Sequence, residues 1–236
     1  VHTESVFLTT VIDALEGRVV AVVDVPGAVM QADMDEIVHV RFTGKLVELL
    51  LEIDRDMYAP CVVTEGKERV MYVELLKALY GTVRAARLFW EKLTGKLLEW
   101  GFTPNPYDSC VMNKIVDGKQ LTVAWHVDDL KVSHVETSVV DLFIADMNKE
   151  FGKEEPLNES RGTIHDYLGM TLDFSTPGQV TITMIDYIKS VLHDAPKEMR
   201  GSAATPAANH LFEVNQVDPV LLGKEEAVIY VHIVMQ

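Results

Sequence analysis

Strand-type and helix-type segments alternate along this chain without a strict repeat, and this alternation limits the folds open to it. Valine-rich runs such as residues 18–25 (RVVAVVDV) indicate strands, whereas apolar residues at helical spacing indicate helices. The Asp-Gly pair within residues 116–119 is a hairpin signal between two strands. We therefore expect an α+β fold, in which helices pack on one face of an antiparallel sheet.

These patterns also give the expected elements. Helices are predicted over residues 6–17, 84–100, 138–151 and 185–193. Strands are predicted over residues 18–25, 38–42, 70–75, 109–115, 121–127, 130–135, 167–174 and 179–184. Residues 46–53 predict a helix or a buried turn. Residues 197–209 are rich in alanine, glycine and proline, which predicts a linker.

Composition narrows the class of protein. The chain has 236 residues, of which 48% are hydrophobic, enough to bury a substantial core. A formal charge of −15 argues against unassisted nucleic-acid binding, which usually depends on a basic face. No apolar run reaches the roughly 20 residues that cross a bilayer, and no signal peptide is recognisable, so a soluble, intracellular protein with no membrane partner is expected. Cys61 and Cys110 lack metal-type spacing, which predicts two inert thiols rather than zinc ligands.

Two adjacent aspartates, Asp128 and Asp129, follow the apolar run over residues 121–127. Successive side chains of a regular strand point to opposite faces, so both carboxylates can act on one centre only if the backbone turns there. One reading is that they are ordinary turn residues. The other is a metal site, because two carboxylates within about 4 Å repel unless a cation neutralises them, and oxygen ligands suit Mg²⁺.

A third carboxylate, Asp24, ends the valine-rich strand, and Pro26 and Gly27 predict a bend directly after it. Three aspartates on adjacent strands can hold two metal ions about 3.5–4 Å apart. Such a site carries out phosphoryl or nucleotidyl transfer.

The sequence resembles the reverse transcriptases of Ty1/copia-type retrotransposons over roughly residues 3–215. The resemblance lies in blocks that occur in the family's order: DVPGAVMQADMDEIVHV (24–40), LLKALYGTVRAARLFWEKL (75–93), LEWGFTPNPYDSCV (98–111), WHVDDL (125–130) and YLGMTLD (167–173). The tandem aspartates match the family's YVDD box. Each block alone is a weak signal, but the ordered series is specific.

The resemblance implies the palm of a right-hand polymerase over residues 1–196, with partial fingers. Residues 197–236 would be a linker and the start of a truncated thumb or connection. It implies an RNA-directed DNA polymerase that joins a deoxynucleotide to a primer 3′-hydroxyl on an RNA or DNA template. The Mg²⁺ ligands (two ions, with Mn²⁺ as a substitute) would be Asp24, Asp128 and Asp129.

The resemblance also implies roles for residues around the three aspartates. The residues near nucleotide or template would be Val29, Tyr80, Gly81, Arg84, Arg87 and His126. Tyr167, Leu168 and Gly169 would correspond to the strand that grips the primer. Further partners would be the remaining Pol segments, including fingers, thumb and ribonuclease H, in a protein that is cytoplasmic and particle-associated or nuclear. The missing start methionine and the uncapped apolar run over residues 227–235 suggest a fragment.

Departures from the family pattern leave other readings open. Val29 stands where the family has an aromatic that excludes the sugar 2′-hydroxyl, Arg84 replaces a common glutamine, and Ala86 replaces proline. One alternative is a catalytically silent protein derived from such an element, which keeps only the palm fold. Another is a phosphohydrolase of the haloacid dehalogenase type, which also places an aspartate after a hydrophobic strand. That family has a second aspartate two residues later, where this chain has Pro26.

Overall fold

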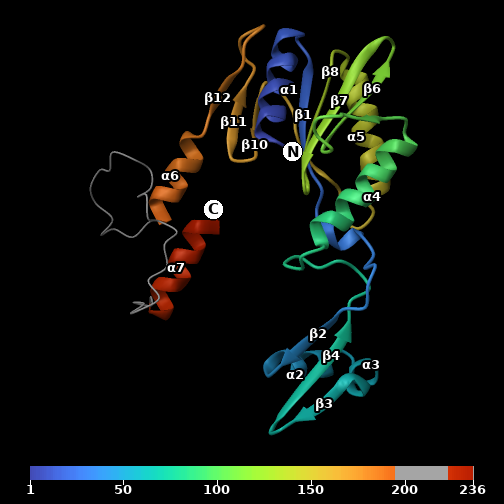
Figure 1. Cartoon of the computed structure of the whole chain (residues 1–236), viewed down its shortest axis with the longest axis vertical. Coiled ribbons are helices and arrows are strands. Elements are labelled where there is room, and N and C mark those ends of the chain that lie inside the picture. The colour runs from blue at the N-terminus through green and yellow to red at the C-terminus, as the bar shows by residue number, and fades with distance from the viewer. Residues whose placement is uncertain (195–222, 236) are drawn as a thin grey trace. The chain divides into compact units, whose positions relative to one another are not determined.

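The structure is a computed structural model that describes residues 1–194 and 223–235. The chain divides into two compact units, Val1–Thr181 and Ile182–Gln236. The first unit contains the six-stranded sheet, its covering helices and a smaller sheet (Figure 1). All the site residues predicted from the sequence lie in this unit.

The main sheet is antiparallel throughout, as expected, and runs in the order β5-β6-β7-β8-β1-β9. Its strands are β1 (Val19–Asp24), β5 (Thr103–Pro104), β6 (Val111–Val116), β7 (Lys119–His126), β8 (Asp129–His134) and β9 (Asn158–Ser160). β6 and β7 form the predicted hairpin, and both turn residues, Asp117 (φ 49°) and Gly118 (φ 75°), are left-handed. This is the backbone that a two-residue Asp-Gly turn requires.

Helices cover one face of the sheet with a large apolar core. α4 (Ala85–Glu99) and α5 (Thr137–Phe151) contribute Phe89, Leu93 and Phe143, among others, to a cluster with the inward residues of β1, β7 and β8. Phe89 and Phe151 meet edge to face, with ring centroids 6.0 Å apart. Burying each large apolar side chain stabilises the fold by roughly 1.5–3 kcal/mol.

The expectation that all helices lie on one face is wrong for α1 (Thr3–Leu15), which lies on the opposite side of the sheet from α4 and α5 (Figure 1). On β8, Leu130 and Val132 point into the core with α4 and α5, while Lys131 and Ser133 point the other way. Asp13 of α1 binds both of these polar residues, with Ser133 Oγ 2.5 Å from Asp13 Oδ1. A buried ionic contact therefore joins α1 to the second face.

A smaller sheet is inserted between β1 and α4. It has the order β2-β4-β3. Its elements are β2 (His39–Thr43), β3 (Val62–Glu65), β4 (Glu68–Glu74), α2 (Lys45–Ile53) and α3 (Arg55–Tyr58), with short 3₁₀ turns at Ala28–Gln31 (η1) and Ala59–Cys61 (η2). Val47, Leu51 and Met71 form its own buried cluster. The strand predictions for residues 38–42 and 70–75 are confirmed, and residues 46–53 form a helix.

The single strand predicted over residues 167–174 is interrupted. The structure has β10 (Ile164–Tyr167) and β11 (Met170–Asp173), which pair antiparallel across a turn at Leu168 and Gly169. Both turn residues have positive φ, 52° and 75°. The turn was not predicted because the run YLGM is mostly apolar and only its glycine indicates a turn.

The end of the chain is described in part. β12 (Thr181–Thr183) straddles the boundary between the units, and the second unit holds α6 (Ile185–Asp194) and α7 (Lys224–Met235). The predicted linker over residues 197–209 lies outside the described residues. Among the helices that are described, none combines the length and the apolarity that a membrane span requires.

The buried contact between Asp13 and Lys131 gives a stability prediction. Replacing Lys131 by alanine leaves the buried Asp13 carboxylate with only Arg18, 3.9 Å away, as a cationic partner, which should lower the free energy of unfolding by up to about 3 kcal/mol. Urea unfolding followed by tryptophan fluorescence measures this, since Trp90, Trp100 and Trp125 all lie in the first unit.

The matched control is Lys153→Ala, which removes a lysine that is 69% exposed and should change the free energy of unfolding by no more than about 0.5 kcal/mol. The double variant Asp13→Leu, Lys131→Met, which removes both charges, should lose much less than Lys131→Ala. Equal losses in the single and double variants would contradict the ionic explanation.

Candidate active site

Strand pairing brings two of the predicted aspartates together. β1 and β8 pair so that Asp24 lies directly opposite Asp129. Residues opposite each other in an antiparallel pair share a face, with Cβ atoms about 4.5–5.5 Å apart. The two carboxylates, separated by more than a hundred positions in sequence, are therefore neighbours at one end of the sheet.

The third aspartate reaches the same place through a tight turn. β7 and β8 are joined by Val127 and Asp128 alone, because His126 already pairs with Asp129. Val127 has a φ of 56°, a conformation that a β-branched residue rarely adopts. The Val25 amide donates a hydrogen bond of 3.1 Å to the Asp128 carbonyl, which ties the turn to the end of β1. The chain therefore turns at the tandem pair, as the sequence required.

Neutral donors hold two of the three carboxylates. The Tyr80 hydroxyl donates to Asp128 Oδ2 at 3.1 Å and also makes a hydrogen bond with the Val29 backbone. The Asn158 amide donates to Asp24 Oδ2, also at 3.1 Å. Burial, with the Asp128 carboxylate second, raises the pKa of Tyr80, so this hydroxyl keeps its proton at neutral pH.

The site has an excess of negative charge. Burial, followed by repulsion from Asp128 and Asp24, raises the pKa of Asp129, while His126 has a small opposing effect. Within the described parts of the chain, no lysine or arginine forms an ion pair with any of the three aspartates.

This charge pattern suits a divalent cation, because carboxylate oxygens are the ligands that Mg²⁺ prefers. The described residues nevertheless hold no set of three acidic, histidine or cysteine side chains already arranged around a single ion position. The three carboxylates nonetheless suit a divalent metal, because their oxygens are the right ligand type and the backbone brings them to one end of the sheet. The side chains of Asp24 and Asp128 point their Oδ2 atoms to Asn158 and Tyr80.

The two predicted phosphate-binding arginines are already paired with acids. Arg84 binds both Asp35 and Glu36, with its Nη1 3.2 Å from Glu36. Arg87 binds Glu91 one turn along α4 at 2.8 Å. Arg84 uses both terminal nitrogens, so a phosphate must compete with Asp35 and Glu36 for this guanidinium, whereas Arg87 binds Glu91 through Nε.

The other residues that were predicted to lie near nucleotide or template differ in their surroundings. His126 and Arg87 line a hollow of about 460 Å³ beside the tandem pair, together with Trp90 and Trp125. Tyr80 is half-exposed above Asp128, and Gly81 follows it with a φ of 89°. The Val29 side chain, by contrast, is buried within a small apolar cluster.

The residues assigned to the primer strand form a hairpin end. Tyr167 is buried, and its hydroxyl donates to the Ala124 carbonyl of β7 at 3.3 Å, while burial raises its pKa. Leu168 and Gly169 form the turn between β10 and β11. This hairpin is therefore anchored to the strand that leads to the tandem aspartates.

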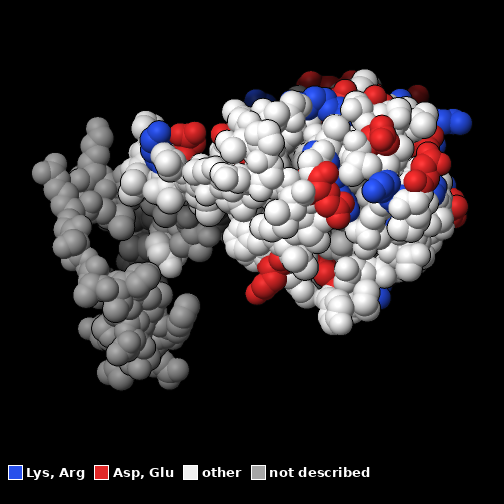
Figure 2. Space-filling view, turned by 90° about the horizontal axis from the view of Figure 1, so that it is seen from above, with Lys and Arg blue, Asp and Glu red and all other residues white. Residues whose placement is uncertain are grey.

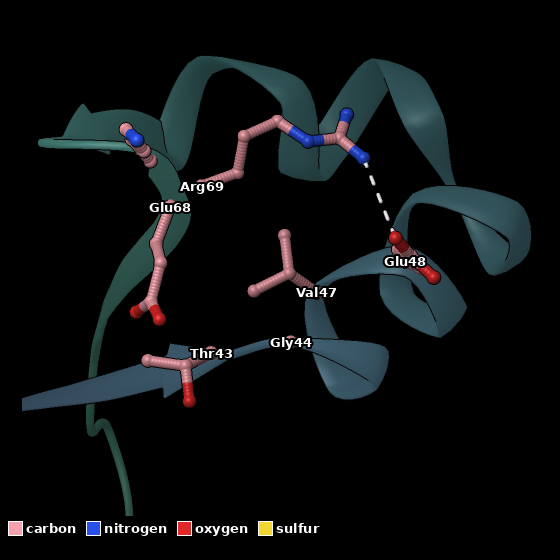
Figure 3. Close-up of a pocket in the computed structure, with 7 residues that line it drawn as sticks. Thr43, Gly44, Val47, Glu48, Glu68 and Arg69 are labelled. Atoms are coloured by element: carbon pink, nitrogen blue, oxygen red, sulfur yellow. Dashed lines mark ion pairs between the residues drawn. The ribbon is translucent and has the colours of Figure 1, made fainter.

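A second hollow, of about 340 Å³, belongs to the smaller sheet (Figure 3). Thr43, Gly44 and Val47 line it at the start of α2, and Arg69 reaches across to Glu48 at 3.8 Å. It shares no residue with the carboxylate site. On the face of the molecule shown in Figure 2, acidic and basic side chains are interspersed rather than gathered into one basic patch.

Asn158 is the site residue that the sequence did not reveal. It lies in β9, a three-residue strand within the polar segment EEPLNES, which carries no alternating apolar signal. Its position beside Asp24 results from the pairing of β9 with β1, in which Asn158 lies opposite Asp24.

Comparison with known proteins identifies the family of the chain. A family described as "Reverse transcriptase (RNA-dependent DNA polymerase)" matches residues 1–209. The putative transposon Ty5-1 protein YCL074W of Saccharomyces cerevisiae is 22% identical over 192 residues, which are 80% of this chain and 55% of that protein. This chain thus spans about half the length of that relative.

Two solved structures show weak likeness. Apo telomerase from Candida tropicalis, truncated from the C-terminal domain, aligns with a TM-score of 0.41 and 14% identity over 77% of this chain and 40% of that chain. Telomerase from Candida albicans in complex with a TWJ fragment of telomeric RNA aligns with a TM-score of 0.40 and 9% identity over 82% of this chain and 38% of that chain.

The raised pKa of Asp129 gives a prediction for the metal-free chain. A carboxyl group whose folded-state pKa lies above its ordinary value of 3.8 binds its proton more tightly when folded, so stability falls as pH rises from that value through the folded-state pKa. Asp129→Asn should remove this loss and raise the melting temperature at pH 7. Thermal unfolding with a chelator present, from acidic to neutral pH, measures the difference, which should vanish below the ordinary pKa. A difference independent of pH would refute the electrostatic cause.

Proposed function

The chain belongs to the reverse transcriptase (RNA-dependent DNA polymerase) family of the Ty1/copia type, and we propose that it is the RNA-directed DNA polymerase region of a retrotransposon, with Asp24, Asp128 and Asp129 as its catalytic centre. The observation that carries this proposal is the placement of Asp24 opposite Asp129, with Asp128 in the adjoining turn. Carboxylates from two distant parts of the sequence are thereby brought to one end of the sheet, where no lysine or arginine among the described residues forms an ion pair with them.

We assign the main sheet with α1, α4 and α5 to the palm of a right-hand polymerase. In this proposal the inserted sheet over residues 39–74 is the partial fingers, and residues 197–236 are a linker and the start of a truncated thumb or connection. The support for the palm is the antiparallel sheet that delivers strand ends to the carboxylate site.

The three aspartates would hold two Mg²⁺ ions, or Mn²⁺ in their place. When bound, such ions activate the attacking hydroxyl and stabilise the leaving phosphate in nucleotidyl transfer. The chain's own groups have complementary tasks. Arg87, and Arg84 once it is released from Asp35 and Glu36, would supply cationic forks for phosphate. Tyr80 would orient Asp128, and His126 borders the hollow in which a template-primer end would lie.

The proposed partners are an RNA or DNA template-primer, a deoxynucleotide and the remaining Pol segments. The negative charge of the chain suggests that basic surfaces of those segments contribute to nucleic-acid binding. Family membership displaces the dehalogenase-type alternative, and Pro26 serves in the structure as part of the turn after β1.

One alternative within the family is a catalytically silent copy that keeps the fold alone. The burial of Val29, where the family has an aromatic beside the sugar, favours this alternative. The retention of all three aspartates opposes it, since like charges placed together are unfavourable for folding.

The direct test is extension of a DNA primer on an RNA template by the full 236-residue chain with Mg²⁺. Asp128→Asn and Asp24→Asn should each lower extension more than about 100-fold, which exceeds the usual effect of changes outside the ligand set. The matched control is Asp117→Asn, the same substitution in the turn between β6 and β7, where asparagine also accepts the left-handed backbone. Extension that survives Asp128→Asn would refute the site, and no extension by the unmodified chain would support the silent alternative.

The pairing of Arg84 gives a second prediction. The double variant Asp35→Asn, Glu36→Gln frees the guanidinium and should tighten primer-template binding by up to about 5-fold, the effect of an exposed ion pair worth about 1 kcal/mol. Fluorescence anisotropy of a labelled duplex measures the affinity.

The control for charge alone is Glu154→Gln, Glu155→Gln, which removes the same charge from an exposed loop. Adding Arg84→Ala to the freed variant should abolish the gain. A gain of equal size in the control would show that net charge, rather than Arg84, is responsible.

A further inference from the structure

Asp24 has a neighbour on each side within the sheet. Asp129 of β8 lies opposite it on one side, and Asn158 of β9 lies opposite it on the other. The three residues form a row across the end of the sheet, and their side chains share one face. The Asn158 amide lies within hydrogen-bonding distance of Asp24, with Nδ2 and Oδ2 3.1 Å apart.

The chemistry of the pair fixes the direction of this hydrogen bond. An ionised carboxylate only accepts hydrogen bonds, so the amide nitrogen of Asn158 must be the donor. The bond engages one oxygen of Asp24 and leaves the other available. An asparagine adds no net charge, whereas a lysine would neutralise Asp24 and an aspartate would repel it.

Asn158 is itself held in place. The preceding residue, Leu157, is buried in the main core, and its amide donates to Asn148 Oδ1 of α5 at 2.9 Å. These contacts attach the start of β9 to α5 and so fix the strand that carries the amide. The donor is therefore presented by an anchored backbone, although its own side chain is exposed.

We propose that Asn158 is a positioning residue for Asp24: it orients the carboxylate so that its free oxygen and those of Asp129 and Asp128 can bind a divalent cation together. This inference rests on the proposed function, because it assigns the cation to the same carboxylate site. Groups that orient the ligands of a metal typically change metal affinity or activity by about 10–100-fold when removed.

Binding of Mn²⁺ to the full chain, followed by electron paramagnetic resonance, tests the proposal without using activity. Asn158→Leu keeps the approximate shape but removes the donor, and it should weaken Mn²⁺ binding by about 10–100-fold. Asn158→Gln keeps an amide donor and should recover part of the affinity. The matched control is Asn113→Leu, which removes an amide hydrogen-bonded to Gln120 on the β6–β7 hairpin and should leave Mn²⁺ affinity unchanged.

A kinetic readout separates positioning from general damage to the fold. In primer extension, Asn158→Leu should raise the Mg²⁺ concentration for half-maximal rate by the same factor while the rate at saturating Mg²⁺ changes less. The melting temperatures of Asn158→Leu and Asn113→Leu should be lowered alike.

The outcomes distinguish the two proposals. Loss of Mn²⁺ binding in Asp24→Asn together with unchanged binding in Asn158→Leu would overturn the role of Asn158 alone. Equal weakening in Asn158→Leu and Asn113→Leu would also overturn it, since the effect would then be structural. A chain that binds no Mn²⁺, or whose binding is indifferent to Asp24→Asn, would overturn the proposed metal site and this inference with it.

Discussion

The antiparallel pairing of β1 with β8 is the constraint on which the rest of the structure depends. Its register places Asp24 against Asp129 at one end and Val19 against His134 at the other. A slip by one residue would move every side chain of one strand to the opposite face. The core residues of that strand would then face α1, and the carboxylates would no longer share a face.

A buried ionic cluster on the same two strands stabilises this register. Lys131 follows Asp129 by two positions and lies on the same face, where Asp13 of α1 binds it. Arg18, directly before β1, reaches Thr122 of β7 at 2.9 Å and lies 3.9 Å from Asp13. Buried charges are costly unless paired, so only the register that brings these groups together satisfies them. The paired polar residues on one face of the sheet thus fix the register of β1 and β8, while the apolar residues on the other face stabilise it.

Periodicity and turn chemistry in the sequence were enough to predict most of the elements. The β6–β7 hairpin and the helices that end near glycine followed from local patterns, and Asp24 was expected beside the tandem pair from its place at a strand end and from the family resemblance. Such features depend on neighbouring residues or on where a strand ends, and both can be read from the sequence.

The features that the sequence did not reveal depend on contacts between distant segments. The position of α1 on the second face is set by a buried salt bridge between residues 118 positions apart. The pairing of β9 with β1 joins a short polar segment to an edge that no pattern marks. The pairing of Arg84 with Asp35 and Glu36 depends on how the chain folds back after η1. In each case the position of the residue depends on a distant partner, which the local sequence does not identify.

The metal-free site shows how a fold can accommodate a charge cluster that folding alone would oppose. Tyr80 donates a hydrogen bond to the Asp128 carboxylate, and Asn158 donates one to the Asp24 carboxylate. Because both donors are neutral, these bonds lower the free-energy cost of placing the charges together but do not neutralise them. Asp129 lies opposite Asp24, and burial together with repulsion from Asp128 and Asp24 raises its pKa. The unusual backbone of Val127 keeps Asp128 beside this group. A lysine in place of Tyr80 or Asn158 would have stabilised the fold further. Its positive charge, however, would have occupied the position in which the proposed function requires a metal ion.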